Sequence, residues 1–515
     1  MQISLFPQPT DRAFDSDVYL SEQSAAIVQR MDEMGGKLYL EFGGKLLFDQ
    51  HASRVLPGFD PNIKMRLLRQ LKDRVDIILC IHAGDIERKK IRADFGITYD
   101  ADAFKLIDDL RDWGLDICAV VITRFSGQAG AVLFQKRLER RGIRVYTHGV
   151  IEGYPADVDL IVSDAGYGSN AYIETTRPLV VVTAPGPCSG KLATCLSQLY
   201  HEAHRGNQVG YAKFETFPVW NLPLRHPVNA AYEAATADLR DVNMIDPFHL
   251  QAYGKTAVNY NRDVEAFPLL QRIIERITGA VSPYSSPTDM GVNRAGYAII
   301  NDELACEAGK QEILRRWHRY ACEAVMGFCD SATLNKVGTL MEEFGLKPED
   351  RDVVLPARRA AEKEEAEESA AEDAPTVFCG AALKMPSGEI VTGHNSALLH
   401  AASAVVLNAI KNLAGIPKQL HLLSPNIVES IAGLKKDILE RKTISLDLEE
   451  TLIALSICST NNHMAGLAIE QLKALRGCEV HLTHLPAPGD EKGLRQLGVN
   501  LTCDPKFATT RLFVS

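Results

Sequence analysis

No apolar run in this sequence approaches the roughly 20 residues that a membrane-spanning helix needs. There is also no excess of basic residues, and the formal net charge is −10. A protein that binds nucleic acid or anionic membranes in general needs a basic surface, so we expect neither partner. The opening residues, MQISLFPQPTDRAF, lack the basic and apolar regions of a secretory signal. We therefore expect a cytoplasmic protein.

The sequence has eleven cysteines but no C-x-x-C pair. Many of them lie within apolar runs such as IILCIH and DICAVV, which is typical of reduced, buried thiols rather than of a disulfide framework. We expect no zinc site. With 515 residues, of which 46% are apolar and 24% charged, the chain is long enough for two or three globular domains.

From residue 37 to about residue 185, apolar β-type runs alternate with helical stretches. Continuously apolar strands separated by helices favour a mostly parallel sheet covered on both faces, which is a doubly wound α/β domain. We assign this domain to residues 1–280 and a helical region to residues 281–357. The helices are expected near 61–73, 101–113 and 128–141. The expected strands are KLYLEF, VDIILCIH, DICAVVIT, IRVYTH, VDLIVSD and LVVVTAP.

The run LVVVTAPGPCSGKLATCLSQL (179–199) has the strand–loop–helix order of a phosphate-binding loop. Glycines let backbone N–H groups point into one concavity, the following helix adds its positive end, and a lysine contacts phosphate. The full pattern has glycine where Pro185 stands and a magnesium-binding hydroxyl where Leu192 stands. A tight strand-to-helix turn with a solvated lysine is the alternative. The candidate ligand-binding residues here are Gly186, Ser189, Gly190, Lys191 and Thr194.

Functional loops of a doubly wound sheet leave the carboxyl ends of its strands. Lys45 and Arg124 follow two of the expected strands and would add positive charge beside the phosphate loop. Asp164, Asp246 and Asp289 are the acidic candidates that would hold a magnesium ion or act as a base. Asp164 ends an apolar run, and Asp289 lies in the turn-rich segment SPYSSPTDMGVN, for which structural Asx-turns are the alternative.

The charged run at 358–375 has helix-forming residues but no apolar stripe, so we take it as an acidic linker or exposed helix at a domain boundary. Residues 376–515 then give a hairpin, a helix, a short strand (QLHLLS) and a helix that starts at Pro425. This order resembles the cytidine-deaminase-like fold, whose helices begin His-x-Glu and Pro-Cys-x-x-Cys around zinc. Here the first motif is His400-Ala401-Ala402 and the second has no thiol. The resemblance therefore implies a deaminase-like α/β domain without zinc ligands.

The chain as a whole resembles a family of bacterial proteins known only as a domain of unknown function. Four segments carry the resemblance, which covers nearly all of the chain except the acidic run, and the family supplies no substrate. It implies a nucleotide-binding-like α/β region, a helical middle and a deaminase-like C-terminal domain. The segments are KLYLEFGGKLLFDQHASRVLPGFDPNIK, APGPCSGKLATCLSQLYHE, SPTDMGVN and DEKGLRQLGVNLTCDPKF.

The leading hypothesis is an enzyme that binds a small phosphorylated molecule, such as ATP or GTP with Mg²⁺, at the 186–191 loop. Phosphoryl transfer or phosphoester hydrolysis is the natural reaction class, because it needs mainly positioning and charge neutralisation. The alternative is a non-enzymatic protein that binds the phosphorylated molecule as a signal, and a purely structural scaffold is the third hypothesis. A large protein with an extra non-catalytic domain is also expected to form a homo-oligomer.

Overall fold

The computed structural model describes residues 12–92, 96–368 and 377–509. The chain divides into two compact units, one up to Glu312 and one from Ile313. This division falls within helix α13 (Asp302–Val325) rather than in the acidic run 358–375. None of the helices among the described residues combines the length and the apolar character that crossing a bilayer requires.

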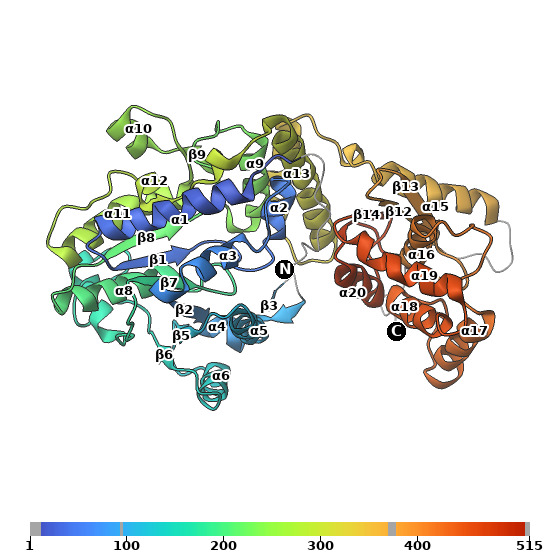
Figure 1. Cartoon of the computed structure of the whole chain (residues 1–515), viewed down its shortest axis with the longest axis horizontal. Coiled ribbons are helices and arrows are strands. Elements are labelled where there is room, and N and C mark those ends of the chain that lie inside the picture. The colour runs from blue at the N-terminus through green and yellow to red at the C-terminus, as the bar shows by residue number, and fades with distance from the viewer. Residues whose placement is uncertain (1–11, 93–95, 369–376, 510–515) are drawn as a thin grey trace. The chain divides into compact units, whose positions relative to one another are not determined.

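The first unit is an α/β layer structure whose strands are joined mainly through helices (Figure 1). Its helices are α1 (Ser16–Glu33), α2 (Gln50–Val55), α3 (Ile63–Gln70), α4 (Ala83–Glu87), α5 (Tyr99–Asp112), α6 (Ala129–Glu139), α7 (Val158–Ile161), α8 (Lys191–His204), α9 (Pro227–Ala235), α10 (Pro247–Tyr253), α11 (Asn261–Thr278) and α12 (Pro287–Met290). Its sheet strands are β1 (Leu38–Phe42), β2 (Val75–His82), β5 (Ile117–Thr123), β6 (Val145–Thr147), β7 (Leu179–Thr183), β8 (Gly210–Phe214) and β11 (Gly291–Val292). Two small antiparallel pairs are β3 (Ile91–Arg92) with β4 (Ile97–Thr98) and β9 (Asn243–Ile245) with β10 (Val258–Tyr260).

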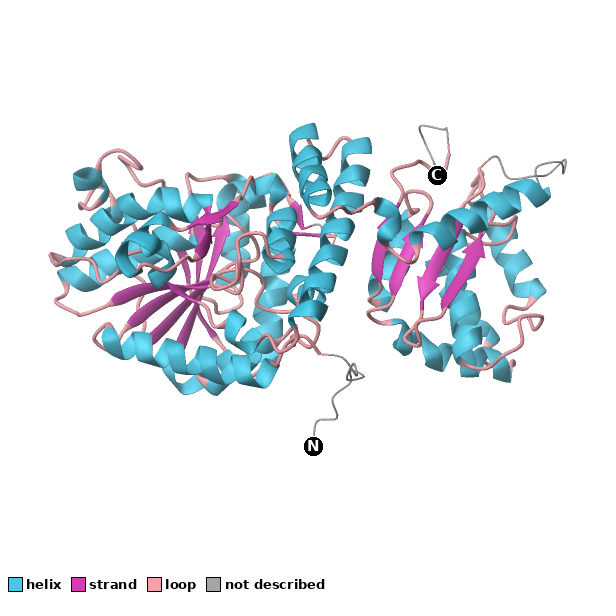
Figure 2. Cartoon of the chain, turned by 90° about the horizontal axis from the view of Figure 1, so that it is seen from above, coloured by secondary structure: helices cyan, strands magenta, loops and turns pink. Residues whose placement is uncertain are grey.

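The seven-stranded sheet has the order β11-β8-β1-β7-β2-β5-β6, and every pairing in it is parallel. All five residues of β7 are buried, as expected for a central strand that helices cover on both faces (Figure 2). The mostly parallel α/β fold expected from the sequence is therefore confirmed. The expected helices near 61–73, 101–113 and 128–141 are α3, α5 and α6.

The strand order reverses direction beside β7. The connection from β2 leads to β5 on one side of the sheet, whereas the connection from its neighbour β7 leads across β1 to β8 on the other side. Loops that leave adjacent strands in opposite directions open a crevice at the carboxyl ends, and ligands of open α/β sheets bind there. The 186–191 loop follows β7 and therefore lies at this switch point.

One expected strand of the first unit is absent. The run VDLIVSD (158–164) forms the short helix α7 and a turn instead. Asp157 N-caps this helix, because its carboxylate accepts the N–H of Leu160 at 3.0 Å. The apolar run buries Ile161 against α8 and its neighbours rather than pairing with the sheet. The Asp157 cap therefore favours a helix in this segment, although its residues have a high β-propensity.

The second unit has its own four-stranded sheet of order β13-β12-β14-β15, in which β12 is antiparallel to both neighbours and β14 is parallel to β15. The sequence-predicted hairpin and terminal strands are confirmed. The strands are β12 (Gly380–Lys384), β13 (Ile390–His394), β14 (Glu479–Leu482) and β15 (Asn500–Cys503). The helices are α14 (Ser331–Glu343), α15 (Val354–Glu368), α16 (Ala401–Leu413), α17 (Pro425–Gly433), α18 (Leu448–Cys458), α19 (His463–Glu470) and α20 (Pro488–Leu497).

One segment of the second unit differs from the sequence-based expectation, whereas the start of the charged run 358–375 takes the helical alternative. The strand expected at QLHLLS does not form, since this segment lies between Pro417 and Pro425 and only Leu422 is fully buried in it. The start of the expected linker is helix α15, whose Ala357 packs so close to β12 that only a glycine fits at position 380. Residues 369–375 of that run lie outside the described residues.

Glu479 at the start of β14 accepts hydrogen bonds from Arg315 at 2.7 and 3.1 Å and from Arg351 at 2.8 Å. Burial raises the pKa of this carboxyl, but the two guanidinium groups outweigh burial and lower the pKa from 4.5 to about 2. Because the folded pKa is the lower one, the carboxylate stabilises the unit above pH 4.5, and this contribution disappears as the pH falls towards 2.

We expect Glu479→Gln to lower the free energy of unfolding by about 3 kcal/mol at pH 7 and by far less near pH 2.5. Denaturation of both proteins at the two pH values measures this difference. The matched control is Glu491→Gln, which removes an exposed i,i+4 pair with Arg495 and is expected to cost at most about 0.5 kcal/mol. A loss of the same size at both pH values would contradict the electrostatic role of Glu479.

Candidate functional site

Two glycines bring the 186–191 loop into direct contact with neighbouring elements. A Cβ on Gly186 would overlap the ring of Tyr99 at the start of α5. Gly190 has φ +81°, and a Cβ there would lie 2.8 Å from the Cβ of Thr123 at the end of β5. The loop after β7 is therefore pressed against α5 and β5, and the glycines are required for this close approach.

The start of helix α8 presents unpaired backbone donors. Gly190 is its N-cap and supplies no capping side chain. Cys188 and Gly190 have positive φ while Ser189 between them does not, which is the alternation of an anion-binding nest. Among the described residues we find no acceptor for the N–H groups of residues 190–193. These four consecutive donors lie at the positive end of a 14-residue helix.

The two hydroxyls that the sequence offered to a ligand have structural roles. Ser189 donates to the carbonyl of Gly186 at 2.7 Å, and its own carbonyl accepts from Thr123 at 2.8 Å. Thr194 is fully buried beneath the loop, where the Cys80 thiol lies 3.5 Å from its Oγ1. Since Leu192 occupies the remaining position, the loop turns no hydroxyl towards a magnesium ion.

Three cations follow three strands of the sheet, namely β7, its neighbour β1, and β5, which β2 separates from β7. Lys191 is half-buried, and no described residue accepts a hydrogen bond from its ammonium group. Burial raises the pKa of the nearby Cys80 thiol to about 12, and the charge of Lys191 opposes this rise. Arg124 follows β5, is exposed and has a φ of 50°. Lys45 follows β1 and lies near the buried Asp49 carboxyl. Burial raises the pKa of Asp49, but the charges of Lys64 and Lys45 outweigh burial and lower it.

Of the expected acids, the structure does not bring Asp164 to this loop. Its carboxylate accepts from the hydroxyl of Tyr200 at 2.8 Å. Tyr200 comes nine residues after Lys191 in α8, which is about 13 Å along the helix axis. Because VDLIVSD is not a strand, Asp164 also does not end one.

Asp246 and Asp289 connect α10 to α12. Asp246 is fully buried, caps α10 through two N–H groups at 3.0 Å and accepts from the Thr288 hydroxyl at 2.6 Å. Asp289 accepts from the Tyr253 hydroxyl at 2.7 Å. Asp289 lies two residues before β11, which is three places from β7 in the sheet, or about 14 Å. Both acids are therefore engaged locally and away from the loop.

Sequence reasoning missed two acids that lie closer to the loop. Glu41 of β1 is in register with Val182 of β7 and accepts from the Tyr211 hydroxyl at 2.8 Å. Glu215 directly follows β8, the strand on the other side of β1. The usable signal was an acid within or just after an apolar strand, as in KLYLEF and YAKFE.

Glu215 lies in a largely buried group of titratable side chains. The Tyr260 hydroxyl is 3.4 Å from its carboxylate, and the neighbouring Lys213 pairs with Asp263. Burial raises the pKa of Glu215 to about 8, and Asp263 raises it further than Lys213 lowers it. The surroundings of Glu215 therefore favour its protonated form. Two strand spacings separate β8 from β7, which is about 10 Å.

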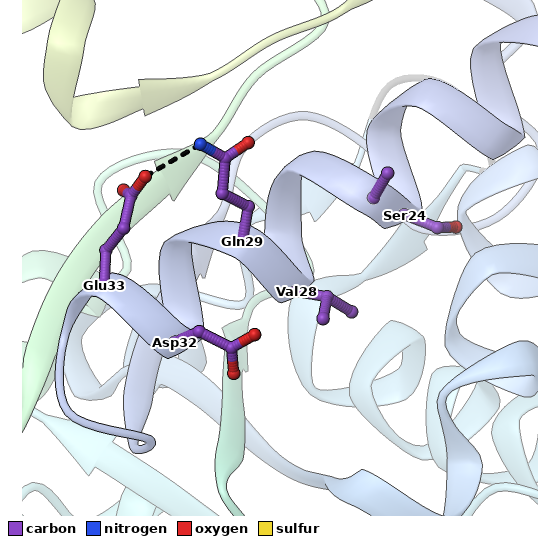
Figure 3. A pocket seen from close by; sticks show the side chains of 6 residues that line it. Ser24, Val28, Gln29, Asp32 and Glu33 are labelled. Atoms are coloured by element: carbon purple, nitrogen blue, oxygen red, sulfur yellow. Dashed lines mark hydrogen bonds between the residues drawn. The ribbon is translucent and has the colours of Figure 1, made fainter.

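Two other groupings among the described residues of the first unit were candidates for a site. The hollow in Figure 3 is lined by six residues of α1 alone, with an internal Gln29–Glu33 hydrogen bond of 2.8 Å. His226, Asp302 and Cys306 place ligand-type atoms close together. However, Nδ1 of His226 accepts the N–H of Val228 at 3.2 Å, so Nε2 carries the proton that faces Asp302 at 3.0 Å. Hydrogen bonding accounts for this arrangement without a metal ion.

Comparison with known proteins identifies the family. Residues 12–345 match the domain of unknown function DUF1846, N-terminal, and residues 349–513 match its C-terminal counterpart. The chain is 56% identical to a UPF0371 protein of Clostridium botulinum (strain Kyoto / Type A2) over 500 residues, which cover 97% of this chain and 99% of that relative. A UPF0371 protein of Clostridium tetani (strain Massachusetts / E88) has the same identity and coverage. The chain belongs to this family, which confirms the resemblance seen in the sequence.

Gly190→Ala tests the close approach of the loop to β5. Alanine at positive φ costs about 1–2 kcal/mol, and the clash with Thr123 adds about 1–3 kcal/mol. Gly127 has a similar φ of +87° but open space around it, so Gly127→Ala is the control and is expected to show only the first cost. Chemical denaturation of both variants measures the difference. Equal losses would mean that the loop is not packed against Thr123.

Glu215→Gln tests the buried carboxyl. Its pKa is higher in the folded state than in the unfolded chain, so the wild type loses stability as the pH rises from about 4.5 to about 8. Glutamine does not titrate, and the variant is expected to gain stability relative to the wild type between pH 5 and pH 9. Paired melting temperatures measure this gain, with the exposed Glu152→Gln as the control. A difference that stays constant across this pH range would refute the raised pKa.

Proposed function

We propose that this protein binds a small phosphorylated molecule at the carboxyl edge of the first unit's sheet, with one phosphate group against the 186–191 loop. The observation that carries the proposal is the row of N–H groups at residues 190–193, which has no acceptor among the described residues and no capping side chain. Helix N-termini with free N–H groups are ready-made anion sites. The ammonium group of Lys191 begins the same helix and supplies the mobile cation.

The chemistry of the loop favours a phosphate group over a magnesium-bound triphosphate. Position 192 is leucine, and the hydroxyls of Ser189 and Thr194 are engaged inside the protein. Charge on the ligand is then neutralised by the side chains of Lys191, Lys45 and Arg124 rather than by a metal that the loop itself holds. ATP and GTP with Mg²⁺ remain candidate ligands alongside simpler phosphates.

The enzymatic form of this proposal is phosphoryl transfer or phosphoester hydrolysis. Glu41 lies one strand from β7, and Glu215 follows the next strand, so both residues lie towards the edge of the sheet that carries the loop. A carboxyl with a raised pKa is suited to donate a proton near neutral pH. These two glutamates replace Asp164, Asp246 and Asp289 as the acids of the proposed site.

A non-enzymatic role is the second candidate, and Leu192 is the observation that favours it. A loop that binds phosphate but cannot position magnesium suits a sensor of a phosphorylated molecule. A deaminase-like second unit without zinc would fit this role. Its helices α16 and α17 begin after His400 and at Pro425, as in that fold. However, Ala402 takes the place of the glutamate, and Asn426 and Glu429 take the places of the two thiols. Homo-oligomer formation stays a prediction.

Thermal-shift measurements test the proposal. The ligands are ATP, GTP, ADP, pyrophosphate and sugar phosphates, each with and without Mg²⁺. A ligand at a hundred times its dissociation constant is expected to stabilise the folded protein by about 2.7 kcal/mol. Lys191→Ala is expected to abolish the shift, whereas Lys136→Ala, which removes an exposed lysine of α6, is expected to keep it.

The outcomes separate the alternatives. A Lys191-dependent shift with magnesium-dependent turnover of the same ligand supports the enzyme, and a shift without turnover supports the sensor. Absence of a shift with every phosphate compound, or a shift that persists in Lys191→Ala, would overturn the phosphate site.

A further inference from the structure

The start of helix α16 in the second unit is a second place with unpaired backbone donors. His400 is its N-cap, but no side chain caps the helix. The next three residues, Ala401, Ala402 and Ser403, are each at most 1% exposed. Within the described part of the chain their N–H groups find no acceptor. Backbone N–H groups that are buried without a partner are rare and costly, so an occupant of this position is expected.

A histidine side chain is fixed at the same position by a buried carboxylate. Nδ1 of His400 lies 2.7 Å from Asp490, which is 1% exposed and whose other oxygen accepts the N–H of Leu448 at 2.9 Å. A carboxylate on Nδ1 fixes the ring and leaves Nε2 for another partner. No described residue bonds to Nε2, and the His400 side chain is 25% exposed. This nitrogen is therefore accessible to a ligand from solution.

A second, independent observation is the unsatisfied histidine beside this pair. His484 follows β14 and is 6% exposed, and its buried Nδ1 has no hydrogen-bond partner among the residues that the structure describes. Leu482, two residues before His484, packs in the same core cluster as Ala401 and Ala402, so His484 lies at the end of the sheet where α16 begins. Burial lowers the pKa of His484 to about 4, while the charge of Asp490 opposes this shift and that of His400 adds to it. A buried polar group without a partner points to a bound water or ligand.

We propose that a small oxyanion, the phosphate or carboxylate group of a metabolite, binds at the N-terminal end of α16. The N–H groups of Ala401–Ser403 donate to its oxygen atoms, Nε2 of His400 donates as well when the ring is doubly protonated, and His484 completes the site. Asp490 is a positioning residue, because it acts through the ring of His400. A metal ion is a poorer occupant, since His400, His484 and Asp490 do not form a group of converging ligand atoms among the described residues.

Histidine-selective NMR on the full chain tests this site independently of the loop in the first unit. The background is Lys191→Ala, which removes the phosphate site proposed there. Inorganic phosphate and acetate are titrated separately. The signals of His400 and His484, assigned with His400→Gln and His484→Gln, are expected to move in a saturable manner. The exposed His421 of the same unit is the internal control and is expected not to move.

Comparison of the phosphate titration with the acetate titration identifies the chemistry of the ligand. Saturation by phosphate alone indicates a phosphorylated ligand, and saturation by acetate alone indicates a carboxylate. His400→Gln is expected to weaken binding about tenfold, or by about 1.4 kcal/mol, while His421→Gln leaves it unchanged. Signals of His400 and His484 that stay fixed with both anions would overturn the proposal, as would binding that His400→Gln does not weaken.

Discussion

The close packing of the loop after β7 against Tyr99 and Thr123 is the constraint on which the proposed site depends. It requires glycine at positions 186 and 190, and the glycine at 190 is also the N-cap of α8. A serine, threonine or aspartate at this position would cap the helix with its own side chain. Because the packing excludes a side chain, the first N–H groups of α8 stay available to an anion. The need for glycine at position 190 therefore has two consequences: it lets the loop pack against Thr123, and it leaves the first N–H groups of α8 without a capping side chain.

The sheet order determines which charged side chains surround these donors. Strand β7 lies between β1 and β2, so the segments that carry Lys45, Glu41 and Glu215 lie on one side of the loop and that of Arg124 on the other. Lys191 begins the helix itself, and the carboxyl with a raised pKa lies about two strand spacings away. This separation is suited to a ligand with a phosphate at one end and a second polar group at the other.

The sequence predicted those features that depend on local pattern. Apolar runs such as VDIILCIH and LVVVTAP are buried parallel strands, and the loop and helix that follow β7 lie where the sequence placed them. Their place in an apolar strand marks Glu41 and Glu215 as candidates, but the sequence could not show that β1 and β8 lie beside β7, which depends on the strand pairing. Asp246 is the N-cap of α10, and an aspartate before a proline has the same sequence appearance whether it caps a helix or binds a metal.

The two expected strands that do not form failed for local reasons: VDLIVSD is capped as a helix by Asp157, and QLHLLS lies between prolines. The contact of His400 with Asp490 spans 90 residues and has no local signature. Long-range hydrogen bonds of this kind require the tertiary structure, and they carry the inference about the second unit.

A crystal structure of the full chain grown with pyrophosphate is the most direct test of the central claim. The account predicts a phosphate group whose oxygen atoms lie about 2.7–3.2 Å from the N–H groups of residues 190–192 and close to the ammonium group of Lys191. Pyrophosphate bound elsewhere, with only water at the start of α8, would contradict the account and leave the loop as a structural turn.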